Sequence, residues 1–161
     1  MTAGPSWTAP GRSRVATFVT VPNAEGTVAF ATAVFGAVSR AAPMRKSDGT
    51  LWNIEMNIGD STIMISRADG DMVRPGFLYV TVPDAAATLA RAVAYGATRI
   101  MPVERRFYGA DDGGVEDPAG NRWWISTHVE DLTDDQIAAM TARQTTVRQR
   151  RSPGRTEATA T

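Results

Sequence analysis

The sequence is short of the residues from which disulfides and metal centres are most often built. Its 161 residues include no cysteine and one histidine, His128. The absence of cysteine excludes a disulfide framework and a thiolate metal site, and one histidine cannot form a histidine cluster for a metal. His128 lies just past the last predicted strand, where a structural or solvent-exposed role is expected. The sequence also has no phosphate-binding glycine loop and no serine or cysteine nucleophile elbow.

Net charge and long apolar runs are missing as well. Seventeen basic residues balance seventeen acidic ones, which removes the general attraction for nucleic acid or an anionic membrane. No apolar run approaches the roughly 20 residues that span a bilayer. A hydrophobic content of 43% suits one compact domain with a sizeable core. We therefore expect a cytoplasmic protein with neither a nucleic-acid nor a membrane partner.

What the sequence does contain is a repeat. Residues 18–23 read FVTVPN and return at 79–84 as YVTVPD. Each copy continues into an alanine-rich stretch with a matched ending, FGA at 35–37 and YGA at 95–97. Because order and spacing repeat together, we interpret the chain as a duplicated half-unit. Two similar halves packed about a pseudo-twofold axis create a site between them, and clefts of this kind are where small ligands tend to bind.

Each copy predicts the element order βαβββ. In the first, β-branched residues predict a strand over 15–21, and Asn23 caps a helix over 24–35 that ends at Gly36. Its other strands are expected at 38–46, 51–58 and 61–66. The second copy is expected to have a helix over 84–95 and strands at 77–82, 97–105, around 114–117 and 121–127. The predicted fold class is α+β, with modules 15–66 and 76–127 inside a domain over 15–131.

The two ends of the chain lie outside the repeat. Residues 1–14 are expected to form a flexible leader. Thr133 and Gln136 have the spacing of a capping box, which predicts a C-terminal helix over 132–147. The arginine-rich residues 148–161 are predicted to be a disordered tail.

The strand ends, the helix ends and one turn motif together carry a resemblance to a known family. The most specific part is the run GGVEDPAGNRWWI at 113–125, whose Asp-Pro-x-Gly-Asn turn closes the second repeat. These features, over about 15–131, resemble the glyoxalase/bleomycin-resistance group of the vicinal oxygen chelate superfamily. The resemblance implies two βαβββ modules whose sheets form a curved surface around one cavity, often completed in a homodimer.

The resemblance also implies a divalent metal in that cavity, held by the first and last strands of each module. Carried over by motif, these positions fall at Ala16, Met64, Phe77 and Trp124. Their side chains carry no oxygen or imidazole donor for Zn, Mg, Mn, Fe or Ni. A shift by one residue would turn the side chains to the opposite sheet face and would restore no ligand set. We therefore expect neither a metal nor another cofactor.

Strand alternation indicates which side chains line the cavity. A two-residue turn at Gly59-Asp60 pairs 51–58 with 61–66. One face of this hairpin then carries Asn53, Glu55, Asn57, Thr62, Met64 and Ser66, and should point into the cavity. The other face carries Trp52, Ile54, Met56, Ile58, Ile63 and Ile65, and should lie beneath the helices. In the second half, Phe77, Tyr79 and Thr81 share a face, as do Arg122, Trp124 and Ser126, while Trp123 belongs to the core.

A loop is expected over 108–114 at the rim of this cavity, where it could close over a ligand. Phe107 and Tyr108 lie at its start. A pocket with aromatic walls and a few polar groups is typical of an organic-ligand site. The predicted ligand-binding residues are Asn53, Asn57, Met64, Phe77, Tyr79, Phe107, Arg122 and Trp124.

Two functions remain open at this point. The first is a metal-independent binding protein that sequesters an aromatic or natural-product ligand, as a homodimer. The second is a metal-free isomerase, lyase or cyclase of secondary metabolism, in which Glu55 or Tyr108 is the acid or base. Arg122 is then an opposing charge that keeps Glu55 ionised. Alternatively, Glu55 faces solvent or forms a structural ion pair.

Overall fold

The computed structural model describes residues 14–151, and residues 144–151 are described by their backbone alone. Residues 1–13 and 152–161 lie outside the described part of the chain. These ranges hold nearly all of the predicted leader and most of the predicted tail.

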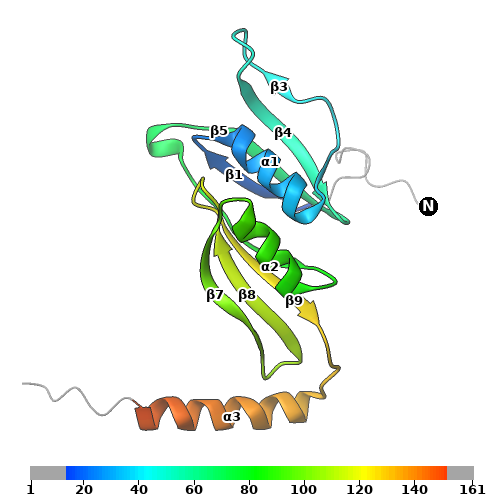
Figure 1. Ribbon diagram of the computed structural model, residues 1–161, viewed down its shortest axis with the longest axis vertical. Coiled ribbons are helices and arrows are strands. Elements are labelled where there is room, and N and C mark those ends of the chain that lie inside the picture. The colour runs from blue at the N-terminus through cyan, green and yellow to red at the C-terminus, as the bar shows by residue number, and fades with distance from the viewer. Residues whose placement is uncertain (1–13, 152–161) are drawn as a thin grey trace, which may run out of the picture.

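The first module follows the predicted order of elements (Figure 1). It comprises β1 (Thr17–Val21), α1 (Ala24–Phe35), β2 (Val38–Ser39), β3 (Met44–Arg45), β4 (Leu51–Ile58) and β5 (Ser61–Arg67). Asn23 accepts a hydrogen bond from the Gly26 N–H at 2.9 Å, and Gly36 ends the helix in the left-handed conformation, as expected. The single strand expected over 38–46 is instead two short strands. Pro43 stands between them and has no N–H to donate to β4.

The second module begins after a short 3-10 helix, Gly70–Met72. It comprises β6 (Phe77–Thr81), α2 (Ala85–Ala94), β7 (Thr98–Arg105), β8 (Ala110–Glu116) and β9 (Arg122–His128). The strand expected around 114–117 thus begins already at Ala110, and most of the loop predicted over 108–114 is strand. The turn between β7 and β8 is made by residues 106–109, where Gly109 has φ of 83°.

The sheets of the two modules have the same topology. The strand order is β1-β5-β4-β2 in the first sheet, where β3 also pairs with β4, and β6-β9-β8-β7 in the second. In each sheet the first and last strands of the module run parallel, and the other pairs are antiparallel. The duplication read from the sequence and the α+β fold class of two βαβββ modules are therefore confirmed.

One helix covers each sheet, and the two helices lie on the same side of the molecule (Figure 1). The two sheets remain separate in strand order, and one antiparallel bridge, Thr20 to Arg74, links β1 to the connection between the modules. The modules share one hydrophobic core. Trp123 of β9 is fully buried, and its ring lies 4.8 Å from that of Phe35 and 5.9 Å from that of Phe30.

The Asp117–Asn121 turn joins the two modules. The Asp117 carboxylate accepts hydrogen bonds from the backbone N–H groups of Ala119 and Asn121, both at 2.9 Å. It also accepts from the Asn121 amide at 2.8 Å and from the Trp123 indole at 3.0 Å. The buried Asn121 side chain accepts from the Gly76 N–H at 2.9 Å, and its Nδ2 reaches the first module, where it donates to Thr27 Oγ1 at 3.4 Å. The motif that is most specific in the sequence is therefore structural.

Trp52 is the one member of the predicted helix-facing set that is largely exposed. The pairing of β3 with β4 shifts register between Met44 and Arg45, so β4 has an extra residue at this point. Such a bulge re-aims the neighbouring side chains. Leu51 takes a buried core position, and Trp52 is 53% exposed.

The C-terminal helix α3 (Asp134–Arg151) extends away from the modules at the bottom of Figure 1. Its capping box is formed as predicted. The Thr133 N–H donates to Gln136 Oε1 at 2.8 Å, and the Gln136 N–H donates to Thr133 Oγ1 at 3.3 Å. The helix runs past its expected end at 147, so the backbone of 148–151 is helical where a tail was expected. Among the described residues, no helix combines the length and the apolar character needed to span a membrane.

Candidate functional site

Each sheet has one face turned away from the helices, and we call these the first and the second open face. The register of β4 with β5 is as predicted, with Asn53 opposite Ser66, Glu55 opposite Met64 and Asn57 opposite Thr62. Phe18 joins this first open face, because it is the register partner of Met64 on β1. The second open face carries Phe77, Tyr79 and Thr81 of β6, Arg122, Trp124 and Ser126 of β9, and Asp112, Gly114 and Glu116 of β8.

The first open face is polar, and hydrogen bonds between strands fix its amide groups. Asn53 Nδ2 donates to Ser66 Oγ at 2.7 Å, and Asn53 is buried. The Thr62 hydroxyl donates to Asn57 Oδ1 at 3.1 Å and accepts from Arg40 Nη1 at 3.2 Å. Glu55 and Met64 lie between these two pairs and are half-buried. The amides are therefore held in defined orientations, as required for polar groups that orient a ligand.

The second open face is aromatic, and its rings are stacked. Phe77 and Trp124 have ring centroids 5.8 Å apart and planes inclined by 26°. Gly114 lies directly opposite Trp124 on β8. Phe77 is 66% exposed and Tyr79 is 57% exposed. Within one chain this face is thus an open aromatic surface, not an enclosed cavity.

A buried carboxylate stands at the end of this aromatic face. Asp112 is fully buried and accepts hydrogen bonds from the Arg106 guanidinium and from the Tyr108 hydroxyl. Arg106 also donates to the Asp112 carbonyl oxygen at 3.2 Å. The hydrogen bond to Asp112 raises the pKa of Arg106, so this guanidinium stays charged. The neighbouring ring of Phe107 packs edge to face on Tyr108, with centroids 5.2 Å apart.

The pKa of Tyr108 bears on its predicted role. Burial, together with the hydrogen bond to Asp112, raises the pKa of Tyr108 to about 12. The phenol is therefore protonated at neutral pH, and its proton is directed at Asp112. A group in this state accepts a hydrogen bond from a ligand but is poorly suited to remove a proton from one.

Arg122 has a partner other than the one expected from the sequence. Its Nε lies 3.0 Å from Glu116 Oε2 on the adjacent strand, and both side chains are well exposed. Glu55, the predicted counter-charge, lies on the other sheet. The prediction that Arg122 keeps Glu55 ionised is therefore wrong for the single chain, where Arg122 pairs within its own sheet.

Asp112, Arg106 and Gly114 were missed as members of the site. Glycines and aspartates are uncommon in strands, so the run Asp111-Asp112-Gly113-Gly114 predicts a loop. Arg106 lies in the turn before β8 and carries no strand signal. Strand alternation identifies Asp112 and Gly114 once β8 begins at Ala110, because both have the same parity as Glu116. The extended pairing with β9 places them on the same face as Trp124 and Ser126.

The residues at the superfamily's metal positions do not fit a divalent metal. Met64 offers one thioether, and the stacked rings of Phe77 and Trp124 occupy two further positions. Ala16 has no donor atom. Among the described residues, no three His, Asp or Glu side chains are grouped so that they could hold a metal ion. Oxygen or nitrogen donors are the chemistry that Zn, Mn, Fe and Ni sites need.

Two cavities lie away from both open faces. One, of about 580 Å³, is a groove between α2 and β7. The other, of about 240 Å³, lies between the start of α1 and the Asp117–Asn121 turn. Neither is lined by a residue that the sequence predicted for the site.

The fold and the paired open faces define a protein of two βαβββ modules, each with one helix and one mixed sheet. The Glyoxalase/Bleomycin resistance protein/Dioxygenase superfamily profile matches residues 12–125. The chain belongs to this superfamily, and the resemblance drawn from its motifs is confirmed.

Mycobacterial proteins match the chain at the sequence level. An uncharacterised protein of Mycobacterium bovis is 28% identical over 109 residues, which is 60% of this chain and 72% of that protein. An uncharacterised protein of Mycobacterium tuberculosis has the same identity over 109 residues, and the match spans 64% of its length.

Solved structures match the fold over most of the chain. TioX from Micromonospora sp. ML1 has a TM-score of 0.60 at 20% identity, covering 73% of this chain and 100% of TioX. A putative 3-demethylubiquinone-9 3-methyltransferase, PhnB protein, from Bacillus cereus has a TM-score of 0.59 at 18% identity, covering 71% and 99%. At these identities the likeness establishes the fold.

Proposed function

We propose that this protein is a metal-independent small-molecule-binding protein of the glyoxalase/bleomycin-resistance type, which sequesters an aromatic or natural-product ligand. The observation that carries the proposal is the stack of Phe77 on Trp124 across the second open face. Exposed, ordered rings offer a flat ligand a large apolar surface at little cost in side-chain entropy. Trp124, Phe77 and Tyr79 stack against the ligand, and Tyr108 accepts a hydrogen bond at the rim.

The site is closed by the first open face of a second copy. Phe18, Phe77 and Tyr79 are all more than half exposed in one chain. Phe18 lies on the first open face and Phe77 and Tyr79 lie on the second, and exposed large apolar side chains on both faces favour an interaction surface. A homodimer places an open face of each type around one ligand, so that the amides of Asn53 and Asn57 orient what the aromatic face binds.

Metal independence follows from the donor chemistry. The metal positions carry a thioether and a pair of aromatic rings, so the energy of binding comes from stacking and burial. Stoichiometric Zn, Mn, Fe or Ni in purified protein would contradict this. Binding that is unchanged by a chelator is the expected result.

Tryptophan fluorescence tests the proposal directly. Titration with a panel of aromatic natural products is expected to give saturable quenching, and Trp124→Ala is expected to weaken binding by about tenfold or more. Trp52→Ala is the control, because Trp52 is an exposed tryptophan of the other sheet and lies outside the proposed site. Titrations that are the same in Trp124→Ala and the unsubstituted protein would refute the assignment of the site. Sedimentation equilibrium tests the dimer, and a monomer at every concentration would refute it.

The enzymatic alternative depends on Glu55. Tyr108 is a poor candidate for the base because of its raised pKa, whereas Glu55 is half-buried on the first open face between the two amide pairs. If a bound compound is turned over, Glu55→Gln is expected to abolish turnover and retain binding. Turnover that survives this substitution would exclude Glu55 as the acid or base.

A further inference from the structure

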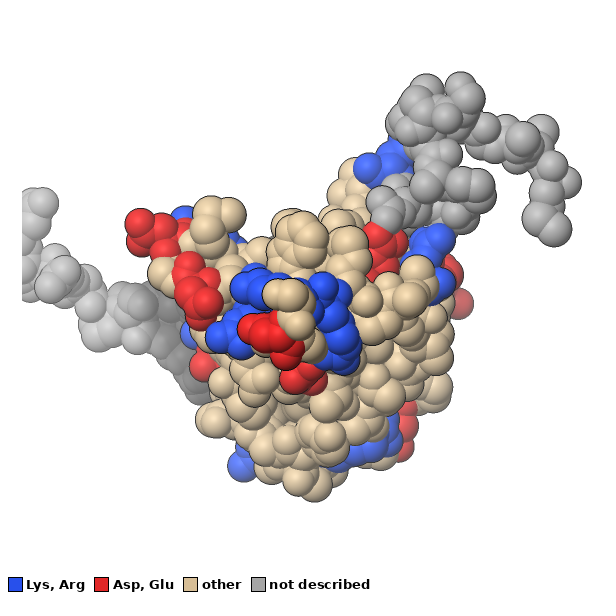
Figure 2. Space-filling model, turned by 90° about the horizontal axis from the view of Figure 1, so that it is seen from above, with Lys and Arg blue, Asp and Glu red and all other residues tan. Residues whose placement is uncertain are grey.

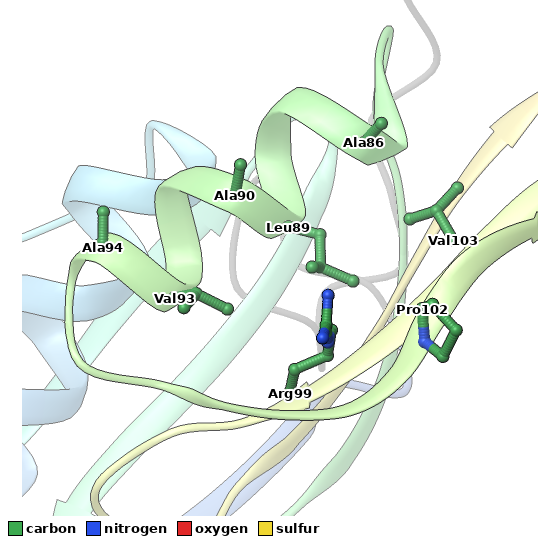
Figure 3. A pocket seen from close by; sticks show the side chains of 8 residues that line it. All are labelled: Ala86, Leu89, Ala90, Val93, Ala94, Arg99, Pro102 and Val103. Carbon is green, nitrogen blue, oxygen red and sulfur yellow. The ribbon is translucent and has the colours of Figure 1, made fainter.

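The groove between α2 and β7 lies on the opposite side of the second sheet from the proposed ligand site. One wall is a stripe of α2, whose residues Ala86, Leu89, Ala90, Val93 and Ala94 recur at the spacing of one helix face (Figure 3). Three of the five are alanines, so this wall is shallow and leaves the groove about 580 Å³ of space. The stripe is about 12 Å long, given the rise of an α-helix.

The other wall belongs to β7, the outermost strand of the second sheet. It contributes Arg99, Pro102 and Val103. Arg99 is the register partner of Val115, a fully buried residue on the helix side of β8, so both point toward α2. Figure 3 shows the Arg99 guanidinium rising between the strand and the helix toward Leu89.

A peptide strand does not fit this groove. The free edge of β7 contains Pro102, which has no N–H to donate, and its pairing with β8 shifts register on both sides of Met101. Such interruptions prevent the continuous ladder that an added strand needs. The same features argue against pairing with β7 of a second copy.

The lining indicates an anionic, aliphatic occupant. All the side chains of the walls are aliphatic except Arg99, and no aromatic ring or acidic group is among them. Over residues 14–143, whose side chains are described, no ion pair or side-chain hydrogen bond is found for Arg99. Neighbouring carboxylates have other partners, since Glu104 lies 3.3 Å from Arg106 and Glu116 lies 3.0 Å from Arg122. An exposed guanidinium that lines an apolar groove is suited to a carboxylate head group.

We propose that this groove binds a free aliphatic carboxylate of medium chain length. The carboxylate pairs with Arg99, and the hydrocarbon chain lies along the alanine stripe of α2. This site is distinct from the aromatic site in position and in ligand chemistry, and it does not depend on the proposed function.

Calorimetric titration of the full-length protein tests the proposal with three probes kept below their micelle concentrations. Decanoate is expected to bind, decanol to bind at least tenfold more weakly because it lacks the charge, and acetate not to bind because it lacks the chain. Equal affinity for decanoate and decanol, or no binding of decanoate at millimolar concentrations, would overturn the proposal.

Substitutions in the groove test where decanoate binds. Arg99→Ala is expected to remove the preference for decanoate over decanol, and Arg143→Ala, an exposed arginine of α3, is the matched control. Ala90→Trp fills the groove from an outward-facing helix position and is expected to abolish binding of both. Arg99→Glu, which repels the carboxylate without filling the groove, is expected to abolish decanoate binding and to keep decanol binding, and it keeps the proposal testable if Ala90→Trp does not fold.

Two variants distinguish ligand binding in the groove from ligand binding at the aromatic site. Trp124→Ala is expected to leave decanoate binding unchanged, and Ala90→Trp is expected to leave quenching by aromatic compounds unchanged. Decanoate binding that is lost in Trp124→Ala and kept in Ala90→Trp would place the ligand on the open face and overturn the groove assignment. A change of oligomeric state in Ala90→Trp, with decanoate binding kept, would make the groove a contact between copies and would also overturn it.

Discussion

The indole ring of Trp124 packs directly against Gly114 on the neighbouring strand. A Cβ atom at Gly114 would come within 2.6 Å of Trp124 Cζ3 and 2.7 Å of Cε3, which is closer than any carbon atoms can pack. Glycine is therefore required at this position so that the ring can lie on the sheet and stack with Phe77. Gly113 and Gly114 both lie within β8, and Gly114 makes room for the aromatic surface.

Gly114→Ala is expected to lift the Trp124 ring from the sheet. The added methyl group has no space, so we expect a stability loss of about 1 to 3 kcal/mol, a shifted tryptophan emission and weaker ligand binding. In a Trp124→Leu background the cost of Gly114→Ala is expected to shrink, because the flexible leucine gives way. Urea denaturation of the four proteins in a double-mutant cycle measures this coupling. Strictly additive costs would contradict the contact.

The Tyr108 phenol is expected to make stability depend on pH in the alkaline range. Its pKa is raised from 10.0 to about 12, first by burial and then by the hydrogen bond to Asp112. The folded protein holds this proton more tightly than the unfolded chain does. Its contribution to the free energy of unfolding is therefore complete below pH 10 and is lost as the pH rises toward 12. Stability should fall more steeply over this interval in the unsubstituted protein than in Tyr108→Phe. Denaturation midpoints measured at several pH values test this, and equal slopes would count against it.

The ultraviolet titration of tyrosinate gives a second measurement of the same group. Tyr108→Phe is expected to remove the component that titrates last. Asp112→Asn is expected to move that component to lower pH, because the negative charge that opposes ionisation of the phenol is removed. A late component that is unaffected by either substitution would belong to another tyrosine.

Asp117→Ala is expected to destabilise the whole domain. The substitution leaves four N–H donors of the turn and of Trp123 without their acceptor, and three of these groups belong to the buried residues Asn121 and Trp123. We expect a loss of about 2 to 4 kcal/mol. Pro118→Ala, one residue further along the same turn and exposed, is the control and should cost less than about 1 kcal/mol. Chemical denaturation measures the free energy of unfolding of both variants. Equal losses would show that the Asp117 carboxylate does not stabilise the turn.

Elements that carry a local signal, such as a turn or a helix cap, could be predicted from the sequence. The errors in the bounds of two strands also have local causes. The Gly59-Asp60 turn fixed the β4–β5 register correctly, because hairpin register follows from the turn. The capping box of α3 was also correct. The strand over 38–46 was divided by Pro43. β8 was predicted too short because Asp111–Gly114 has little intrinsic strand preference, and pairing with β9 overrides that preference.

The exposure of Trp52 depends on a contact that no local pattern encodes. The bulge that exposes Trp52 arises where β3 meets β4, two strands whose register is set by the irregular segment between them. Arg122 lies opposite Glu116 because the Asp117–Asn121 turn joins β8 to β9, and the strands expected around 114–117 and over 121–127 already indicate this pairing.

The sequence by itself determined the duplicated βαβββ plan, the superfamily and the loss of metal-ligand chemistry at Met64, Phe77 and Trp124. Repeats, turns, caps and residue types are properties of short segments, and they can be read without knowing what packs against them. Only the tertiary structure decided that Asp112 is buried against Arg106 and Tyr108, that Gly114 supports Trp124, and that Arg99 faces a groove under α2. Each of these depends on which strands and helices become neighbours, because burial and contact between distant residues arise from packing and not from local sequence.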